Sequence, residues 1–101
     1  MTLQVVIAPE AERQAREIDR WWRENRAAAP GLFLDEFAAA VELIGDMPLA
    51  GRRYMGGPVR GVRRVLLRST RYHVYYVVRK SEALILAVWS AVRGTGPDLR
   101  R

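Results

Sequence analysis

The first quarter of the chain changes from a short apolar run to a helical period. The run VVI at residues 5–7 favours extended structure and predicts a strand over residues 3–8, which Pro9 ends. Pro9 also suits the first position of a helix, where Glu10 and Glu12 complement the positive end of the helix dipole. Apolar residues then recur at helical spacing and predict a helix over residues 9–25, whose inner face consists of Ala11, Ala15, Ile18 and Trp22.

A second helical pattern begins after the breakers Pro30 and Gly31. It should end near Met47, because Pro48 disfavours helical structure at the residue before it. Its apolar stripe consists of Phe33, Phe37, Ala40, Val41 and Ile44. Because only a short connection joins the two helices, we expect them to form an antiparallel hairpin.

The second half of the chain has the patterns of a sheet. Four glycines and Pro58 predict a loop over residues 49–61, and strands are expected over residues 62–68, 72–79 and 83–92. The last of these, ALILAVWSAV, is apolar nearly throughout, as in a central strand covered on both faces. We therefore expect a single domain over residues 1–101 with an α+β fold. In it, an N-terminal strand and the antiparallel helix hairpin precede a three-stranded antiparallel sheet packed against the helices.

Alternation along the strands sorts the side chains onto two faces of this sheet. The helices need an apolar face, so we expect them to cover Val65, Leu67, Tyr72, Val74, Tyr76 and Val78. In the last strand, the set that contains Arg93 would bury an unpaired charge under the helices. We therefore expect Leu84, Leu86 and Val88 to point inward, and Ile85, Ala87, Trp89 and Arg93 to point outward. The second face should be open, and its partner-binding candidates are Arg64, Arg68, Tyr75, Trp89 and Arg93.

The net charge of +6 is divided unequally along the chain. Residues 1–50 hold five basic and nine acidic residues, a balance of −4, whereas residues 51–101 hold twelve basic and two acidic residues, a balance of +10. A positive field of this kind favours phosphates or an acidic protein partner.

Other residue types narrow the possible classes of protein. The chain has no cysteine, which excludes disulfides and thiolate-bound metals, and a lone histidine is poor ligand material, so we expect no metal and no cofactor. No apolar run approaches the roughly 18 residues of a membrane span. The start MTLQVVIAPEAERQ lacks the order of a signal peptide. A soluble cytoplasmic protein is expected.

Three stretches resemble those of a known superfamily. These are PLAGRR at residues 48–53, similar to a family loop of the pattern P..GR, RSTRYHVYYVV at residues 68–78, and AVWSAVRG at residues 87–94. With the order of the expected elements, they resemble the RelE/ParE superfamily of bacterial toxins from type II toxin–antitoxin pairs. The resemblance covers nearly the whole chain. It implies an antitoxin protein as partner, bound through an acidic or amphipathic segment.

The superfamily resemblance implies one of two activities. RelE-like members cut messenger RNA on the ribosome, whereas ParE-like members act on DNA gyrase. The RelE-like pattern has basic residues two apart on the strand at 62–68, an arginine after the first tyrosine of the next strand, an arginine that ends the last strand, and a tyrosine near the C-terminus. Arg64 and Arg93 match the first and last of the basic positions, and His73 replaces the arginine of the third strand. Leu66 stands at the second basic position and Leu99 about where the tyrosine is expected. The ending VWSAVRG resembles the ParE-like pattern V.HGAR, which favours the gyrase branch.

Three hypotheses follow. The first is a toxin that inhibits DNA gyrase without being an enzyme. The second is a metal-independent ribonuclease that uses Arg64, His73 and Arg93, because RNA cleavage needs a proton acceptor and cations at the phosphate. The third is a non-toxic module that only binds an antitoxin. For His73 the plainer alternative is a partly exposed sheet residue that hydrogen-bonds a neighbour. Trp22 is the better candidate for the core, and Trp21 at the surface would be a contact for a partner or a second copy, with plain core packing as the alternative.

Overall fold

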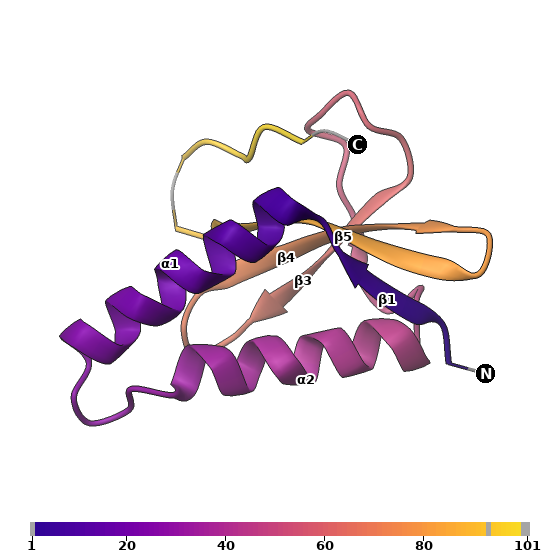
Figure 1. The fold of residues 1–101 in the computed structure, drawn as a ribbon. Coiled ribbons are helices and arrows are strands. Elements are labelled where there is room, and N and C mark those ends of the chain that lie inside the picture. The colour runs from indigo at the N-terminus through magenta and orange to yellow at the C-terminus, as the bar shows by residue number, and fades with distance from the viewer. Residues whose placement is uncertain (1, 93, 100–101) are drawn as a thin grey trace.

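The computed structural model describes residues 2–92 and 94–99. Two helices and five strands follow the chain in the order shown in Figure 1. They are β1 (Gln4–Ile7), α1 (Pro9–Asn25), α2 (Leu32–Asp46), β2 (Arg52–Arg53), β3 (Val62–Leu67), β4 (Tyr72–Arg79) and β5 (Glu82–Ser90). The α+β class and the helix hairpin are confirmed. No helix in the described part of the chain is long and apolar enough to cross a membrane.

The sheet has more strands than the sequence predicted. Its order is β1-β5-β4-β3-β2, with β1 parallel to β5 and all other neighbours antiparallel. The N-terminal strand therefore joins the same sheet, beside the last strand. The expected loop over residues 49–61 contains β2, which pairs Arg52 with Arg64 and Arg53 with Arg63. These two additions correct the predicted three-stranded sheet to a mixed five-stranded one.

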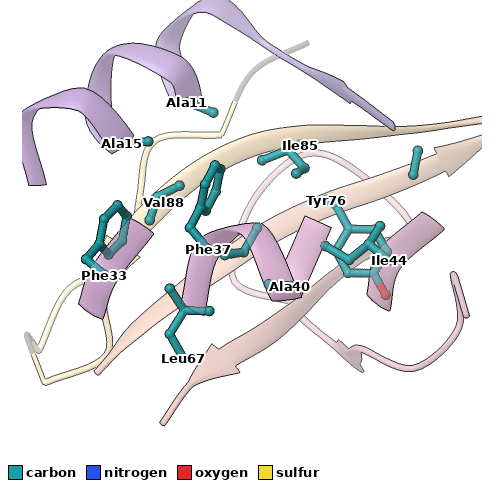
Figure 2. Packing of buried hydrophobic residues seen from close by; sticks show 12 residues of the cluster. Ala11, Ala15, Phe33, Phe37, Ala40, Ile44, Leu67, Tyr76, Ile85 and Val88 are labelled. Carbon is teal, nitrogen blue, oxygen red and sulfur yellow. The ribbon is translucent and has the colours of Figure 1, made fainter. Parts of the chain in front are cut away.

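The helices cover one face of this sheet, called here the helix face. Figure 2 shows side chains of α1 and α2 meeting those of β3, β4 and β5 in one cluster. Phe33 stacks on Phe37 at 5.8 Å between ring centroids and meets the edge of Tyr72 at 5.5 Å. The six residues of β3 and β4 that alternation assigned to the helices all belong to this cluster. Trp22 packs at its border and Trp21 is exposed, as expected.

A β-bulge in β5 makes part of the predicted face assignment wrong. Tyr75 pairs with Ala87 but the next residue, Tyr76, pairs with Ile85, so Leu86 is an extra residue in β5. An extra residue reverses the alternation on one side of the bulge. Consequently Ile85 points to the helices, whereas Leu84 and Leu86 point away from them. Beyond the bulge the prediction holds, since Val88 lies under the helices and Ala87 and Trp89 lie opposite.

The second face of the sheet is covered rather than open. It carries its own buried cluster, made of Val62, Tyr75, Val77, Leu86, Ala87 and Leu99 with Tyr54, Val59, Leu84 and Trp89 at its border. The cover consists of residues 54–59, which precede β3, and the C-terminal residues 94–99. Leu99 lies beside Gly57, so these two distant segments meet over the sheet (Figure 1). The expectation of an open second face is therefore wrong for its central part.

Candidate functional site

Arg64 lies at the centre of the candidate site, on the second face. It stands opposite Tyr75 in the β3–β4 ladder, and its Nη1 donates a hydrogen bond of 3.3 Å to the Tyr75 hydroxyl. The guanidinium carbon lies 5.1 Å from the ring centroid of Tyr54 and 5.9 Å from that of Tyr75. Such contacts with two aromatic faces orient an arginine without neutralising it. Arg64 is thus a positioned cation at the border of the covered cluster.

His73 lies on the same face, two residues before Tyr75 on β4. Its ring meets that of Tyr75 at 5.9 Å, and its cross-strand neighbours are Leu66 and Trp89. Burial, together with the charges of Arg64 and Arg71, holds the pKa of His73 below its usual value. A lowered pKa leaves the imidazole mainly neutral at pH 7, so it can accept a proton there.

Two pairs of like charges stand where β2 meets β3. Arg52 is opposite Arg64, and Arg53 is opposite Arg63. Like charges directly opposite each other in a sheet are destabilising. Arg63 donates hydrogen bonds to the carbonyls of Leu49 and Gly51, but none of the four arginines pairs with a carboxylate in the described residues. All ion pairs between two described residues lie within α1, so no carboxylate of the described chain pairs with the positive charge of this strand pair.

A carboxylate on α2 holds the turn between β3 and β4. Glu36 accepts hydrogen bonds from the amides of Ser69 and Thr70, both at 2.9 Å, and from the Thr70 hydroxyl at 2.7 Å. Burial alone would raise the pKa of Glu36, but these hydrogen bonds outweigh it and the pKa is lowered. The turn carries Arg68 and Arg71, whose side chains are exposed. By holding the backbone of the turn, Glu36 therefore fixes the positions from which the exposed side chains of Arg68 and Arg71 extend.

The C-terminal segment closes the second face beside this site. The Trp89 indole donates a hydrogen bond of 3.0 Å to the Thr95 carbonyl, and Leu99 is only 2% exposed. The Tyr54 hydroxyl fits between Gly56 and Gly96, and a Cβ built on either glycine would lie 2.3 Å from it. This separation is far below van der Waals contact, so a larger residue at either position would displace the Tyr54 ring from its place in the cover.

A cleft of about 960 Å³ lies between α1 and β5, next to the same C-terminal segment. Its lining includes Ile18, Tyr72 and Trp89. β1 pairs with β5 only as far as Ile85, and beyond it the Gln14 side chain accepts a hydrogen bond of 2.8 Å from the Val88 amide. Gln14 thus takes the place of a strand partner along this part of the edge.

The structure brings some of the predicted site residues together and not others. Arg64, His73, Tyr75 and Trp89 do come together on the second face, and Arg68 stands exposed at the end of β3. Tyr75, however, is 2% exposed, so its ring is part of the buried cluster instead of an open surface. Arg93 lies outside the described residues. Among the described residues there is no group of three histidine or acidic side chains that could hold a metal ion.

Sequence reasoning missed two residues of the site. The sequence pattern places Tyr54 in a loop without a role, although the glycines at 56 and 57 are the kind of neighbours that permit a close approach. No sequence signal places Arg52 opposite Arg64. The two residues, more than ten positions apart in the chain, meet because β3 pairs with β2. In the sequence Leu99 stands out only as a departure from the nuclease pattern, whereas in the structure it is part of the buried cover.

Comparison with known proteins places this arrangement in a family. The model of the ParE toxin of the type II toxin–antitoxin system parDE matches residues 5–93. No curated protein sequence matches the chain significantly. A solved chain of the chromosomal ParDE system from P. aeruginosa shares the fold with a TM-score of 0.68 and 16% identity, covering 88% of this chain and 96% of that one.

A second solved structure, a double mutant of E. coli toxin RelE in the free state, has a TM-score of 0.52 and 20% identity. It covers 91% of this chain and 86% of that chain. At these identities the two likenesses show the fold alone, whereas the family model spans nearly the whole chain. The chain therefore belongs to the ParE toxin family of type II toxin–antitoxin systems.

Proposed function

We propose that this toxin acts by inhibiting DNA gyrase, without cleaving a substrate itself, and that a cognate antitoxin neutralises it. The observation that carries the proposal is the composition of the second face. Where the RelE-like residue set requires a second basic residue and a C-terminal tyrosine, this chain has Leu66 and Leu99, and Leu99 is buried beneath the loop that contains Gly57. A buried leucine offers no group that could transfer a proton or stabilise a phosphate.

One observation favours ribonuclease activity as a second candidate. His73 and Arg64 share a face, and the lowered pKa of His73 leaves its imidazole able to accept a proton at neutral pH. With Arg93, these residues would be the catalytic groups of a metal-independent nuclease acting on ribosome-bound RNA. Against this candidate, Leu66 stands two residues after Arg64, where the RelE-like pattern has a basic residue, and the described C-terminal residues 94–99 include no tyrosine.

Two assays on the purified toxin separate the candidates. In a supercoiling assay with DNA gyrase, the proposal expects dose-dependent loss of supercoiling that the antitoxin reverses. In a translating extract, it expects intact transcripts. Transcript cleavage that disappears in both His73→Ala and Arg64→Ala would favour the nuclease instead. If neither activity is found and cells expressing the chain alone grow normally, the third hypothesis, a non-toxic antitoxin-binding module, replaces both.

A further inference from the structure

The outer edge of β3 is only partly paired. β2 covers β3 at Arg63 and Arg64, and the adjoining Tyr54 amide donates to the Val62 carbonyl at 2.9 Å. Val62 and Arg64 therefore direct their backbone groups toward β2, and alternation directs those of Leu66 the same way. No strand of the described chain lies beyond β3 at that position, because β2 is last in the sheet order and its pairing ends at Arg64. Leu66 thus presents a free N–H and C=O at an open edge.

The open edge is lined on one side by an apolar hollow. A cavity of about 240 Å³ lies between α2 and the end of β3, lined by Glu36, Ala39, Ala40, Leu43, Val65, Leu66, Leu67 and Arg68. Leu43, on the α2 side of the hollow, is 36% exposed, a large fraction for a leucine. The one carboxylate in the lining, Glu36, is already occupied by three hydrogen bonds from the β3–β4 turn. This side of the edge therefore suits an apolar side chain.

The other side of the edge is positively charged. Leu66 shares its face with Arg64, and Arg68 follows at the end of the strand. Arg52 stands opposite Arg64, and neither has a carboxylate partner among the described residues. Side chains of an added strand would alternate between these two sides. The strand that fits would carry apolar residues toward α2 and acidic residues toward the arginines.

We propose that the open edge of β3 from Val65 to Arg68 binds an extended segment of the antitoxin with alternating apolar and acidic side chains. The backbone of the segment bonds to Leu66, its apolar side chains enter the hollow beside Leu43, and its carboxylates pair with Arg64 and Arg68. The charge complementarity of the site selects this occupant over a nucleic acid, because a phosphate backbone has no apolar side chains for the hollow. This inference rests on the proposed pairing of the toxin with an antitoxin.

Hydrogen exchange of the wild-type toxin tests the backbone contact. The probe is the purified antitoxin of the same parDE pair, added to the full-length toxin. The Leu66 amide should become protected in the complex, whereas the Val65 amide, which faces β4, should be protected already in the free toxin. A complex that leaves the Leu66 amide exchanging at its free rate overturns the inference, even if the toxin inhibits gyrase.

Matched substitutions test the side-chain contacts. Arg68→Glu should weaken antitoxin binding by about tenfold or more, whereas Arg20→Glu, the same charge change at an exposed position of α1, should change it by about twofold or less. Leu66→Pro removes the outward N–H and should weaken binding more than Leu66→Ala, which keeps it. If Leu66→Pro fails to fold, the Arg68→Glu and exchange results still decide the question.

Equal effects of Arg68→Glu and Arg20→Glu would overturn the charge pairing. The same exchange experiment with DNA gyrase distinguishes the partners, because protection of Leu66 by gyrase and not by the antitoxin would overturn the assignment of the occupant. A toxin that binds the antitoxin in this way yet leaves gyrase untouched would refute the proposed target alone. Failure to form any complex with the antitoxin would refute this inference while leaving gyrase inhibition to be judged by its own assay.

Discussion

The two faces of the sheet bury neighbouring tyrosines of the same strand in different ways. Tyr76, on the helix face, donates a hydrogen bond of 2.7 Å to the Pro48 carbonyl and accepts one of 3.0 Å from the Gly51 amide. Tyr75, on the second face, accepts a longer bond of 3.3 Å from Arg64. Both rings are buried, but regular helices cover the first and two irregular segments cover the second.

This difference suggests different roles for the two faces: the helix face stabilises the fold, and the second face presents groups to partners. The helix face is apolar to its edges, so its burial supplies most of the driving force for folding. The second face mixes a small apolar cluster with Arg64 and His73 at its border, and charged residues beside aromatic rings contribute little stability but leave cations in fixed positions. We therefore expect substitutions on the helix face to unfold the protein and those on the second face to alter its contacts with partners.

The largest effect should come from the helix face. Phe33→Ala removes a fully buried ring that contacts both Phe37 and Tyr72, and it should lower the free energy of unfolding by about 3–5 kcal/mol. Chemical denaturation measures this loss. Met55→Ala, at a side chain 88% exposed, is the control and should stay within about 0.5 kcal/mol of the wild type.

A smaller effect is expected from the centre of the second face. Leu99→Ala deletes a buried side chain, but the loss should be about 2 kcal/mol, at the low end for such a change, because the C-terminal segment can detach locally. Hydrogen exchange should become faster in residues 54–59 and 94–99 while α1 and α2 keep their protection. A loss as large as that of Phe33→Ala would show that the two faces are energetically equivalent.

The fit of Tyr54 between two glycines can be tested separately. Gly96→Ala places a methyl group against the Tyr54 hydroxyl and should destabilise the protein by about 1–3 kcal/mol. The penalty should shrink when Tyr54→Phe removes that hydroxyl, as a double-mutant cycle by thermal unfolding would measure. Gly94→Ala, where nothing lies within 4 Å of the added Cβ, serves as control. An unchanged penalty in the Tyr54→Phe background contradicts the closure.

The smallest effect concerns the contact between the helix layer and the β3–β4 turn. Glu36→Gln replaces the charged acceptor of three hydrogen bonds and should cost about 1–2 kcal/mol at pH 7. The pKa of Glu36 is lowered in the folded state. Its contribution is therefore fully present above the unfolded-state pKa and is lost as the pH falls through the folded-state pKa.

Denaturation between pH 7 and acid conditions checks this pH dependence. The stability of Glu36→Gln should fall less steeply on acidification than that of the wild type. Glu24→Gln, on the exposed side of α1 and without a side-chain hydrogen bond among the described residues, should reproduce the slope of the wild type. Parallel slopes for all three proteins would remove the role assigned to Glu36.

Much of the fold could be predicted because its signals are local. The sequence predicts the first helix over residues 9–25, and the structure has it there. Its signals, Pro9 at the start and apolar residues at helical spacing, lie within the helix itself. The strand over residues 72–79 was likewise predicted with its bounds. The bulge at Leu86 could not be predicted, because a run that is apolar at nearly every position has no alternation to break.

The candidate site was predicted less completely. Alternation along β3 and β4 placed Arg64 and His73 on one face, because these strands mix charged and apolar residues. Alternation cannot show what covers a face, so the burial of Tyr75 was missed. Its cover comes from Tyr54, earlier in the chain, and from Leu99 at its end. Such contacts join residues that are remote in sequence, and no local period records them.

The sequence by itself determined the two helices, the class of the fold, the concentration of positive charge in the second half and the resemblance to toxins of the RelE/ParE superfamily. These features depend on neighbouring residues or on sums over the chain. Only the tertiary structure decided that β1 lies beside β5, that β2 places Arg52 opposite Arg64, and that the edge of β3 is left open beyond Arg64. Strand pairing joins backbone groups that every residue possesses, so it leaves little trace in residue type.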